Sequence, residues 1–134
     1  MLRSIPLMIV PLILFNLAPM GLFGAGSADP WDEPVAGFGM VSGGAFTLDW
    51  GTVLVTLGLL LLFAELLKST RTTNASVVDH LLSIFVFVAF LIEFLLVPAA
   101  AHPVFFLLMV IALIDVLAGF SVSLRAAGRD VNWN

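Results

Sequence analysis

Residues 104–124 read VFFLLMVIALIDVLAGFSVSL, and this stretch decides the fold class. Fifteen of its residues are Val, Ile, Leu, Phe or Met, and its one ionisable residue is Asp115. A helix needs about 20 mainly apolar residues to cross a lipid bilayer. On insertion scales the apolar residues contribute about −6 kcal/mol, which outweighs the cost of about 3 kcal/mol for a carboxyl group at mid-membrane. The stretch therefore predicts a membrane-spanning helix.

Three further segments satisfy the same criterion of length and apolar composition. They are residues 4–24, 50–67 and 77–97. Hydrophobic residues make up 61% of the 134-residue chain and charged residues only 10%, which is too few polar groups to cover a globular surface in water. We therefore expect an all-α integral membrane protein with four transmembrane helices, in which residues 1–134 form a single membrane domain.

The composition also excludes several classes of function. A chain without cysteine has no disulfide framework, no thiolate nucleophile and no Cys-ligated metal site. The net charge of −4 and the lack of a basic run argue against nucleic-acid binding, which needs clustered Lys and Arg. We therefore expect no nucleic-acid partner.

The five basic residues set the expected orientation, because they all fall on one side of the four spans. By the positive-inside rule this side is cytoplasmic, so both termini and the loop 68–76 lie inside the cell. The loop 25–48 then lies outside, and it carries acids but no Lys or Arg. The expected location is the bacterial inner membrane. The basic residues are Arg3, Lys68, Arg71, Arg125 and Arg129.

The first segment has a second interpretation. An N-terminal arginine, an apolar stretch and the small residues 26–28 also resemble a secretory signal peptide with its cleavage site. We favour the transmembrane interpretation, and the signal peptide stays its alternative.

The connections between the spans differ in character. Pro98 ends the third helix and Pro103 suits the first turn of the fourth, so we expect a tight hairpin that makes helices three and four antiparallel neighbours. The loop 25–48 is long, flexible and rich in glycine, and it contains aromatic residues and acids. It could lie along the outer interface, dock on a partner or serve as a plain connection.

Ionisable residues inside the predicted spans are the candidate functional residues, because each is costly in a bilayer. Counting about 1.5 Å per residue places Asp115 near the midplane and Glu93 about 9 Å toward the outside. Glu65 and His80 both fall about 10 Å toward the cytoplasm, so we predict a hydrogen bond between them that joins the second and third helices. Asp115 and Glu93 have no basic residue at their depth. We expect these two to be neutral, or hydrogen-bonded to another helix of this chain or a partner.

Small residues recur on two helix faces, where they let another helix come close. In the second span Gly51 and Gly58 share a stripe with Glu65, at a spacing of seven residues. In the fourth span the small residues lie beside Asp115, and they are Ala112, Ala118 and Gly119. We predict that these five small residues form helix–helix contacts.

The sequence contains no recognisable catalytic arrangement. His80 and His102 lie about 30 Å apart along the helices, so one chain cannot form a bis-His haem site. His80, Asp79 and Glu65 could approach one metal ion, but adjacent residues 79 and 80 point about 100° apart on a helix. We therefore expect no enzymatic activity, no metal and no cofactor, while binding of a quinone or lipid cofactor between helices stays open.

The expected function is that of a non-enzymatic accessory or structural subunit of a larger membrane assembly, or of a homo-oligomer. The expected partners are other transmembrane subunits, further copies of this chain, and lipid. The alternative is a small proton- or ion-coupled channel or transporter module. In that interpretation Glu93, Asp115, Glu65 and His80 line a path, and water must bridge the uneven gaps between them.

Overall fold

The computed structural model describes residues 5–18, 29–69 and 75–132, which are mostly helical. Three helices are long and apolar enough to cross a membrane, and the first helix is short. The four are α1 (Ile9–Leu17), α2 (Trp50–Ser69), α3 (Ala75–Leu96) and α4 (Pro103–Asn132). The prediction of a mostly helical chain is therefore confirmed, and three of the four predicted spans are helices that could cross a membrane. Residue 4 and residues 19–24 of the predicted first span lie outside the described residues.

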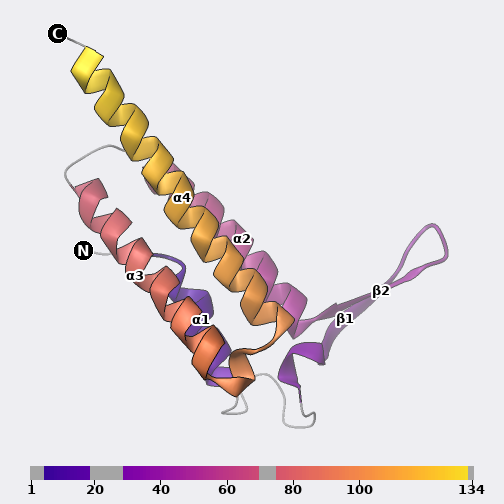
Figure 1. The fold of residues 1–134 in the computed structure, drawn as a ribbon. Helices are drawn as coiled ribbons and strands as arrows, with labels where there is room; N and C mark the ends of the chain where they lie inside the picture. Colours follow the sequence, from indigo (N-terminus) through magenta and orange to yellow (C-terminus); the bar gives the residue numbers. More distant parts are fainter. Residues whose placement is uncertain (1–4, 19–28, 70–74, 133–134) are drawn as a thin grey trace.

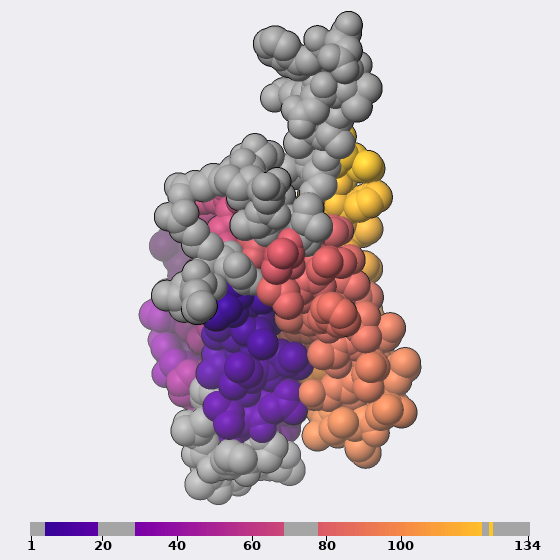
Figure 2. Space-filling model, turned by 90° about the vertical axis from the view of Figure 1, so that its left-hand side faces the viewer, coloured from indigo at the N-terminus to yellow at the C-terminus, as the bar shows by residue number. Residues whose placement is uncertain are grey.

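α4 is the central helix of the bundle. It packs along α2 on one side and along α3 on the other, and these are the two most extensive helix–helix contacts (Figure 1). On the face in Figure 2, α1 lies alongside α3, and α1 also contacts α2 and α4. The bundle encloses a single core of large apolar side chains. The most deeply buried are Met8, Pro11, Phe90, Phe105 and Leu108.

Aromatic rings hold one end of the bundle together. The ring of Phe105 in α4 lies 4.8 Å from that of Phe15 in α1 and 5.3 Å from that of Phe90 in α3. Phe15 also stacks on Trp31, with ring centroids 5.0 Å apart. Trp31 belongs to a short 3-10 helix, η3 (Pro30–Asp32). Edge-to-face and stacked pairs of this kind add to the energy of plain burial, so this cluster ties α1 and η3 to the long helices.

The predicted tight hairpin joins α3 to α4. α3 is followed by a single 3-10 turn, η4 (Pro98–Ala100), and α4 begins three residues later. Val97 is extended, with φ −102° and ψ 118°, because a residue before proline is driven out of the helical region. At the start of α4 the Nδ1 atom of His102 accepts a hydrogen bond of 3.1 Å from the backbone N–H of Val104. Pro98 therefore ends α3, and the side chain of His102 caps the start of α4.

The segment expected to be a flexible loop contains a β-hairpin, which the sequence interpretation missed. β1 (Pro34–Gly39) pairs antiparallel with β2 (Ala45–Asp49). Gly43 in the connecting turn has a φ of +89°, which a residue with a side chain rarely adopts. β2 runs directly into α2, and the hairpin projects sideways from this end of the bundle (Figure 1).

Candidate functional site

Three polar side chains are buried in the described part of the bundle, and we call them the buried acid cluster. They are Glu65 of α2, Ser83 of α3 and Asp115 of α4, with exposed fractions of 5%, 7% and 6%. A side-chain hydrogen bond joins Ser83 to Asp115, and the carboxyl group of Glu65 lies within electrostatic range of Asp115. Asp115 is thus buried against another helix of the same chain. Ser83 supplies the polar partner that a carboxyl group needs away from water.

Glu65 contacts the first described residues of the chain. Its Oε1 atom accepts a hydrogen bond from the backbone N–H of Leu7, which precedes α1. The Nζ atom of Lys68 lies 3.5 Å from the same oxygen and donates a bond of 3.1 Å to the carbonyl oxygen of Ile5. A carboxylate near the start of a helix pairs with amide groups that have no partner in the helix itself. The last turns of α2 therefore hold the chain where it enters α1.

The predicted hydrogen bond between Glu65 and His80 is wrong, because it is not among the bonds that the described residues form. The ring of His80 instead stacks against Phe120 of α4, with centroids 5.9 Å apart. Matching depth was the basis of the prediction, but α2 and α3 each pack chiefly on α4 rather than on each other. Two residues at one level can then face different neighbours.

Glu93 has a partner that sequence reasoning did not identify. The Nδ2 atom of Asn16 in α1 donates a hydrogen bond of 3.0 Å to Oε1 of Glu93, and one of 2.8 Å to the carbonyl oxygen of Leu12. The other carboxyl oxygen of Glu93 is buried and accepts no hydrogen bond within the described part of the chain. The available signal was that Asn16 is the one amide side chain in the predicted first span.

An apolar layer separates Glu93 from the buried acid cluster. Ser83 and Glu93 lie ten residues apart on α3, which is about 15 Å along a helix. Side chains that are at most 8% exposed fill the interior between these levels, and they are Val86, Phe90, Leu108 and Ile111. The intramembrane acids that the sequence singled out therefore form two separate sites.

The small residues predicted as helix contacts lie inside this chain's own interfaces. A Cβ atom on Gly51 would lie 2.8 Å from Val104 of α4, and one on Gly58 would lie 3.1 Å from Leu108. A Cβ atom on Gly119 would approach His80 of α3 to 3.2 Å. Ala112 is buried and Ala118 is half-buried. The three glycines let α4 approach α2 and α3 closely.

A hydrogen bond between the side chains of Asp29 and His102 lies at the end of the bundle where α3 turns back into α4. The Nε2 atom of His102 is 2.7 Å from Oδ2 of Asp29, and the backbone N–H of Trp31 donates to Oδ1 of Asp29 at 3.0 Å. Burial raises the pKa of Asp29, but the hydrogen bonds from His102 and Trp31 outweigh this effect and leave the pKa lowered. The pair connects the segment before η3 to the hairpin between α3 and α4.

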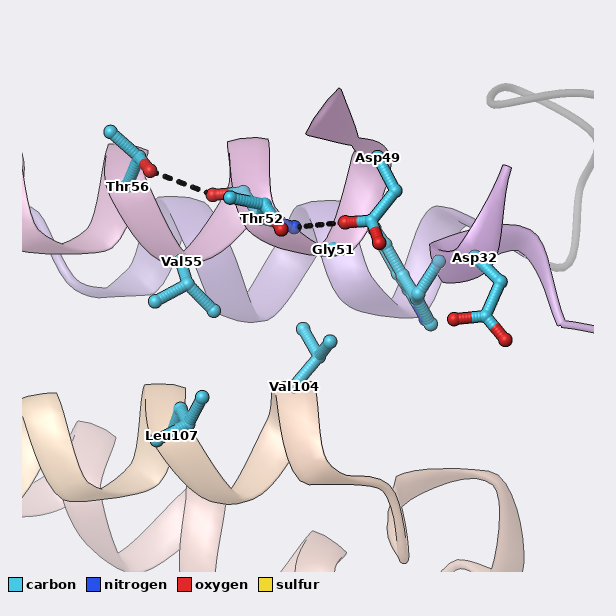
Figure 3. A pocket seen from close by; sticks show the side chains of 9 residues that line it. Asp32, Asp49, Gly51, Thr52, Val55, Thr56, Val104 and Leu107 are labelled. Carbon is cyan, nitrogen blue, oxygen red and sulfur yellow. Dashed lines mark hydrogen bonds between the residues drawn. The ribbon is translucent and has the colours of Figure 1, made fainter. Parts of the chain in front are cut away.

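An open pocket of about 300 Å³ lies between the first turns of α2 and α4, beside η3 (Figure 3). One oxygen of Asp49 accepts a hydrogen bond of 2.7 Å from the backbone N–H of Thr52 and so caps α2. The hydroxyl group of Thr56 donates to the carbonyl oxygen of Thr52 at 2.8 Å. The pocket is lined by Trp31, Asp32, Asp49, Gly51, Thr52, Val55, Thr56, Val104 and Leu107.

Across residues 5–18, 29–69 and 75–132, no three His, Cys, Asp or Glu side chains are grouped so that they could hold a metal ion. Comparison with protein-family models, curated proteins and solved structures found no match for this chain.

Proposed function

We propose that this chain is a non-enzymatic structural subunit of a larger membrane assembly, and that its β-hairpin docks on a protein partner. The observation that carries the proposal is the division of the hairpin into two unlike faces. Phe38 lies opposite Phe46 and Ala36 opposite Leu48, so these four share one face. The Phe38 and Phe46 rings stack with centroids 6.4 Å apart. On the other face the paired residues are small, namely Gly37, Gly39, Ala45 and Thr47, and Val35 lies at the irregularity near the start of β1.

The apolar face of the hairpin, defined by Ala36, Phe38, Phe46 and Leu48, is largely uncovered. Phe38 is 51% exposed and Phe46 is 44% exposed. No charged residue occurs between Glu33 and Asp49. An isolated two-stranded hairpin is only marginally stable in water, so it gains stability when another surface covers its apolar face.

The free strand edges favour protein over lipid as that surface. A two-stranded sheet leaves one edge of each strand unpaired, with backbone N–H and C=O groups available. Lipid chains can cover phenylalanine rings but cannot satisfy these groups, whereas a protein partner can do both by adding a strand or side-chain donors.

The proposed membrane arrangement has four spans with both termini in the cytoplasm. Ile5 and Leu7 contact the end of α2, while Phe15 contacts Trp31 beside the start of α2. The segment 5–18 therefore extends along most of the length of α2, which supports a first span despite the short helix α1. Lys68 lies at the end of the bundle opposite the β-hairpin, and by the positive-inside rule this supports a cytoplasmic location for that end.

The alternative function, a proton- or ion-coupled module, has less support. Glu65, Asp115 and Glu93 each have a partner from this chain, namely Leu7, Ser83 and Asn16. The apolar layer between the two acid sites opposes a continuous path for protons or ions, because moving charge needs polar groups or water at each step.

Photocrosslinking in native membranes tests the partner. A photoreactive amino acid is placed at Phe38 or Phe46 on the apolar face and, as a matched control, at Phe85, which lies on a membrane-spanning helix and is 68% exposed. We expect the hairpin positions to form an adduct with a protein of one defined mass, and Phe85 to label lipid. Adducts with lipid alone from Phe38 and Phe46 would contradict the proposal, and an adduct with a second copy would restrict it to a homo-oligomer.

Cysteine labelling tests the orientation, because the native chain has no cysteine. Ser27→Cys and Ser69→Cys are made singly and exposed to a membrane-impermeant reagent in intact cells. We expect Ser27→Cys to react and Ser69→Cys to react only after lysis. The reverse pattern would overturn the proposed topology and the location of the hairpin with it.

A further inference from the structure

The pocket between α2 and α4 is polar at one end and apolar at the other. Figure 3 places the carboxyl groups of Asp32 and Asp49 at one end, and Val55 and Leu107 toward the other. We infer that this pocket binds the ammonium headgroup of a membrane lipid, with the first carbons of the lipid chains against the apolar wall. The inference is independent of the protein partner proposed for the β-hairpin.

The pocket mouth carries two negatively charged carboxyl groups, and only one of their four oxygen atoms accepts a hydrogen bond from the described residues. Asp49 caps α2 through its Oδ1 atom, which leaves its second oxygen available. The carboxyl group of Asp32 is exposed and accepts no hydrogen bond from the described residues. None of the nine lining residues is basic, and Lys68 lies at the far end of α2. Two carboxylates without a cation attract an ammonium group and repel a phosphate or other anion.

The pocket also lies at the depth where a lipid changes from polar to apolar. The spans of α2 and α4 begin at Trp50 and Pro103. Asp32 and Asp49 precede these residues in their segments, whereas Val55 and Leu107 fall within the first two turns of the spans. A lipid beside the bundle therefore presents its headgroup to the acids and its upper chain to the apolar wall, without burying a charge in the hydrocarbon region.

The shape of the pocket limits the ligand to a small headgroup. Gly51 lies at the contact of α2 with α4, where even a Cβ atom would come within 2.8 Å of Val104 and 3.1 Å of the carbonyl oxygen of Trp31. The two helices are thus in close contact at Gly51, and this contact forms part of the pocket wall. A volume of about 300 Å³ is at the small end for ligand sites. It suits the ethanolamine group with its ammonium between the acids, and the adjoining phosphate then points out of the open pocket toward water, while glycerol and the lipid chains lie along the helix surface.

Lipid titration of the purified protein in detergent tests the inference. The probes are short-chain phosphatidylethanolamine, phosphatidylglycerol with the same chains, and a short alkylammonium ion. Bound molecules are counted by native mass spectrometry. We expect phosphatidylethanolamine to bind at least about tenfold more tightly than phosphatidylglycerol, because only the former carries an ammonium group. The alkylammonium ion should compete with it. Equal binding of the two lipids would overturn the inference.

Variants locate the binding to the pocket. Asp32→Asn combined with Asp49→Asn removes both charges while asparagine still caps α2, so the fold is retained. We expect this variant to lose about tenfold in affinity for phosphatidylethanolamine. Val55→Phe fills the pocket without changing the charge and should cause a similar loss. Glu33→Gln is the matched control, because Glu33 is a neighbouring acid outside the lining. Unchanged binding in the double variant, or an equal loss in Glu33→Gln, would show that the pocket is not the site.

Discussion

The helical bundle and the β-hairpin are both rich in apolar residues, but exposure means different things in the two regions. Leu60 and Phe85 of the bundle are 63% and 68% exposed, and lipid covers them in a membrane. Phe38 and Phe46 of the hairpin are similarly exposed at the end of the bundle, where water or a partner must meet them. The helices also satisfy their own backbone groups, whereas the hairpin leaves two strand edges open. Lipid can therefore cover the exposed apolar side chains of the bundle, whereas the hairpin needs a partner that also pairs with its open strand edges.

The largest expected effect is the difference in stability loss between two Phe→Ala variants, one in the bundle and one in the hairpin. Phe105→Ala removes a side chain that is fully buried among Phe15, Phe90 and Phe94, and we expect a loss of about 3 kcal/mol in the free energy of unfolding. Phe46→Ala should cost less than about 1 kcal/mol, because its ring contacts only Phe38 strongly. Unfolding in mixed micelles measures both. Equal losses would mean that the hairpin is part of the cooperative fold.

A second contrast uses glycine. In Gly51→Ala the new methyl group meets Val104 at 2.8 Å and the Trp31 backbone at 3.1 Å, so α2 and α4 must move apart at a cost of about 2 kcal/mol. In Gly37→Ala nothing lies within 4 Å of the new group, and stability should change by less than about 0.5 kcal/mol. The same unfolding assay compares them. A neutral Gly51→Ala would show that the first turns of the bundle are loosely packed.

The third prediction concerns the buried acid cluster. Asp115→Leu removes the hydrogen bond to Ser83 and should cost about 1 kcal/mol, which is typical of hydrogen bonds between membrane helices. Asp115→Asn should be tolerated, because an amide can still donate and accept. A double-mutant cycle with Ser83→Ala measures the coupling. If the native chain conducts protons and Asp115→Asn abolishes this flux while leaving stability intact, the proton-carrying alternative is favoured.

The smallest expected effect is the pH dependence of the hydrogen bond between Asp29 and His102. The pKa of Asp29 in the folded protein is lowered from its ordinary value of 3.8. The stabilisation is therefore fully present above that value and is lost as the pH falls through the lowered pKa. Because the pair is partly exposed, the loss should stay below about 1 kcal/mol.

The matching measurement compares unfolding of the native chain with that of Asp29→Asn as a function of pH. The difference in stability should shrink as the pH falls below 3.8. A difference that stays constant with pH would exclude a role for the charge on Asp29.

The sequence was sufficient for the long helices and for the connection between the third and fourth. A helix forms wherever an apolar run of about 20 residues occurs, and the two prolines Pro98 and Pro103 end one helix and start the next. Both effects depend on local sequence, so they can be predicted without knowing the tertiary contacts. The burial of Asp115 also followed from its position within such a run.

The pairing of polar residues needed information that the sequence pattern lacks. Counting residues along the helices places Glu65 and His80 at one depth, but it does not show that α4 packs between α2 and α3. The partners of Glu65 and Glu93 come from the first segment, through a backbone N–H and through Asn16. The hairpin was missed because glycine and exposed phenylalanine obscure the alternation of polar and apolar residues that identifies a strand.

The contacts of Asn16 and Phe15 also constrain the order in which the protein can be completed during synthesis. Glu93, which binds Asn16, follows it by 77 residues, and Phe105, which packs on Phe15, belongs to the last helix. The ribosome therefore makes the segment 5–18 long before these two partners. Glu65 and Lys68 can hold the start of the segment as soon as α2 has been made. At its other end Phe15 can stack on Trp31 early, but the contacts with Glu93 and Phe105 form only after the chain has passed those residues, so the packing of the segment 5–18 is completed late.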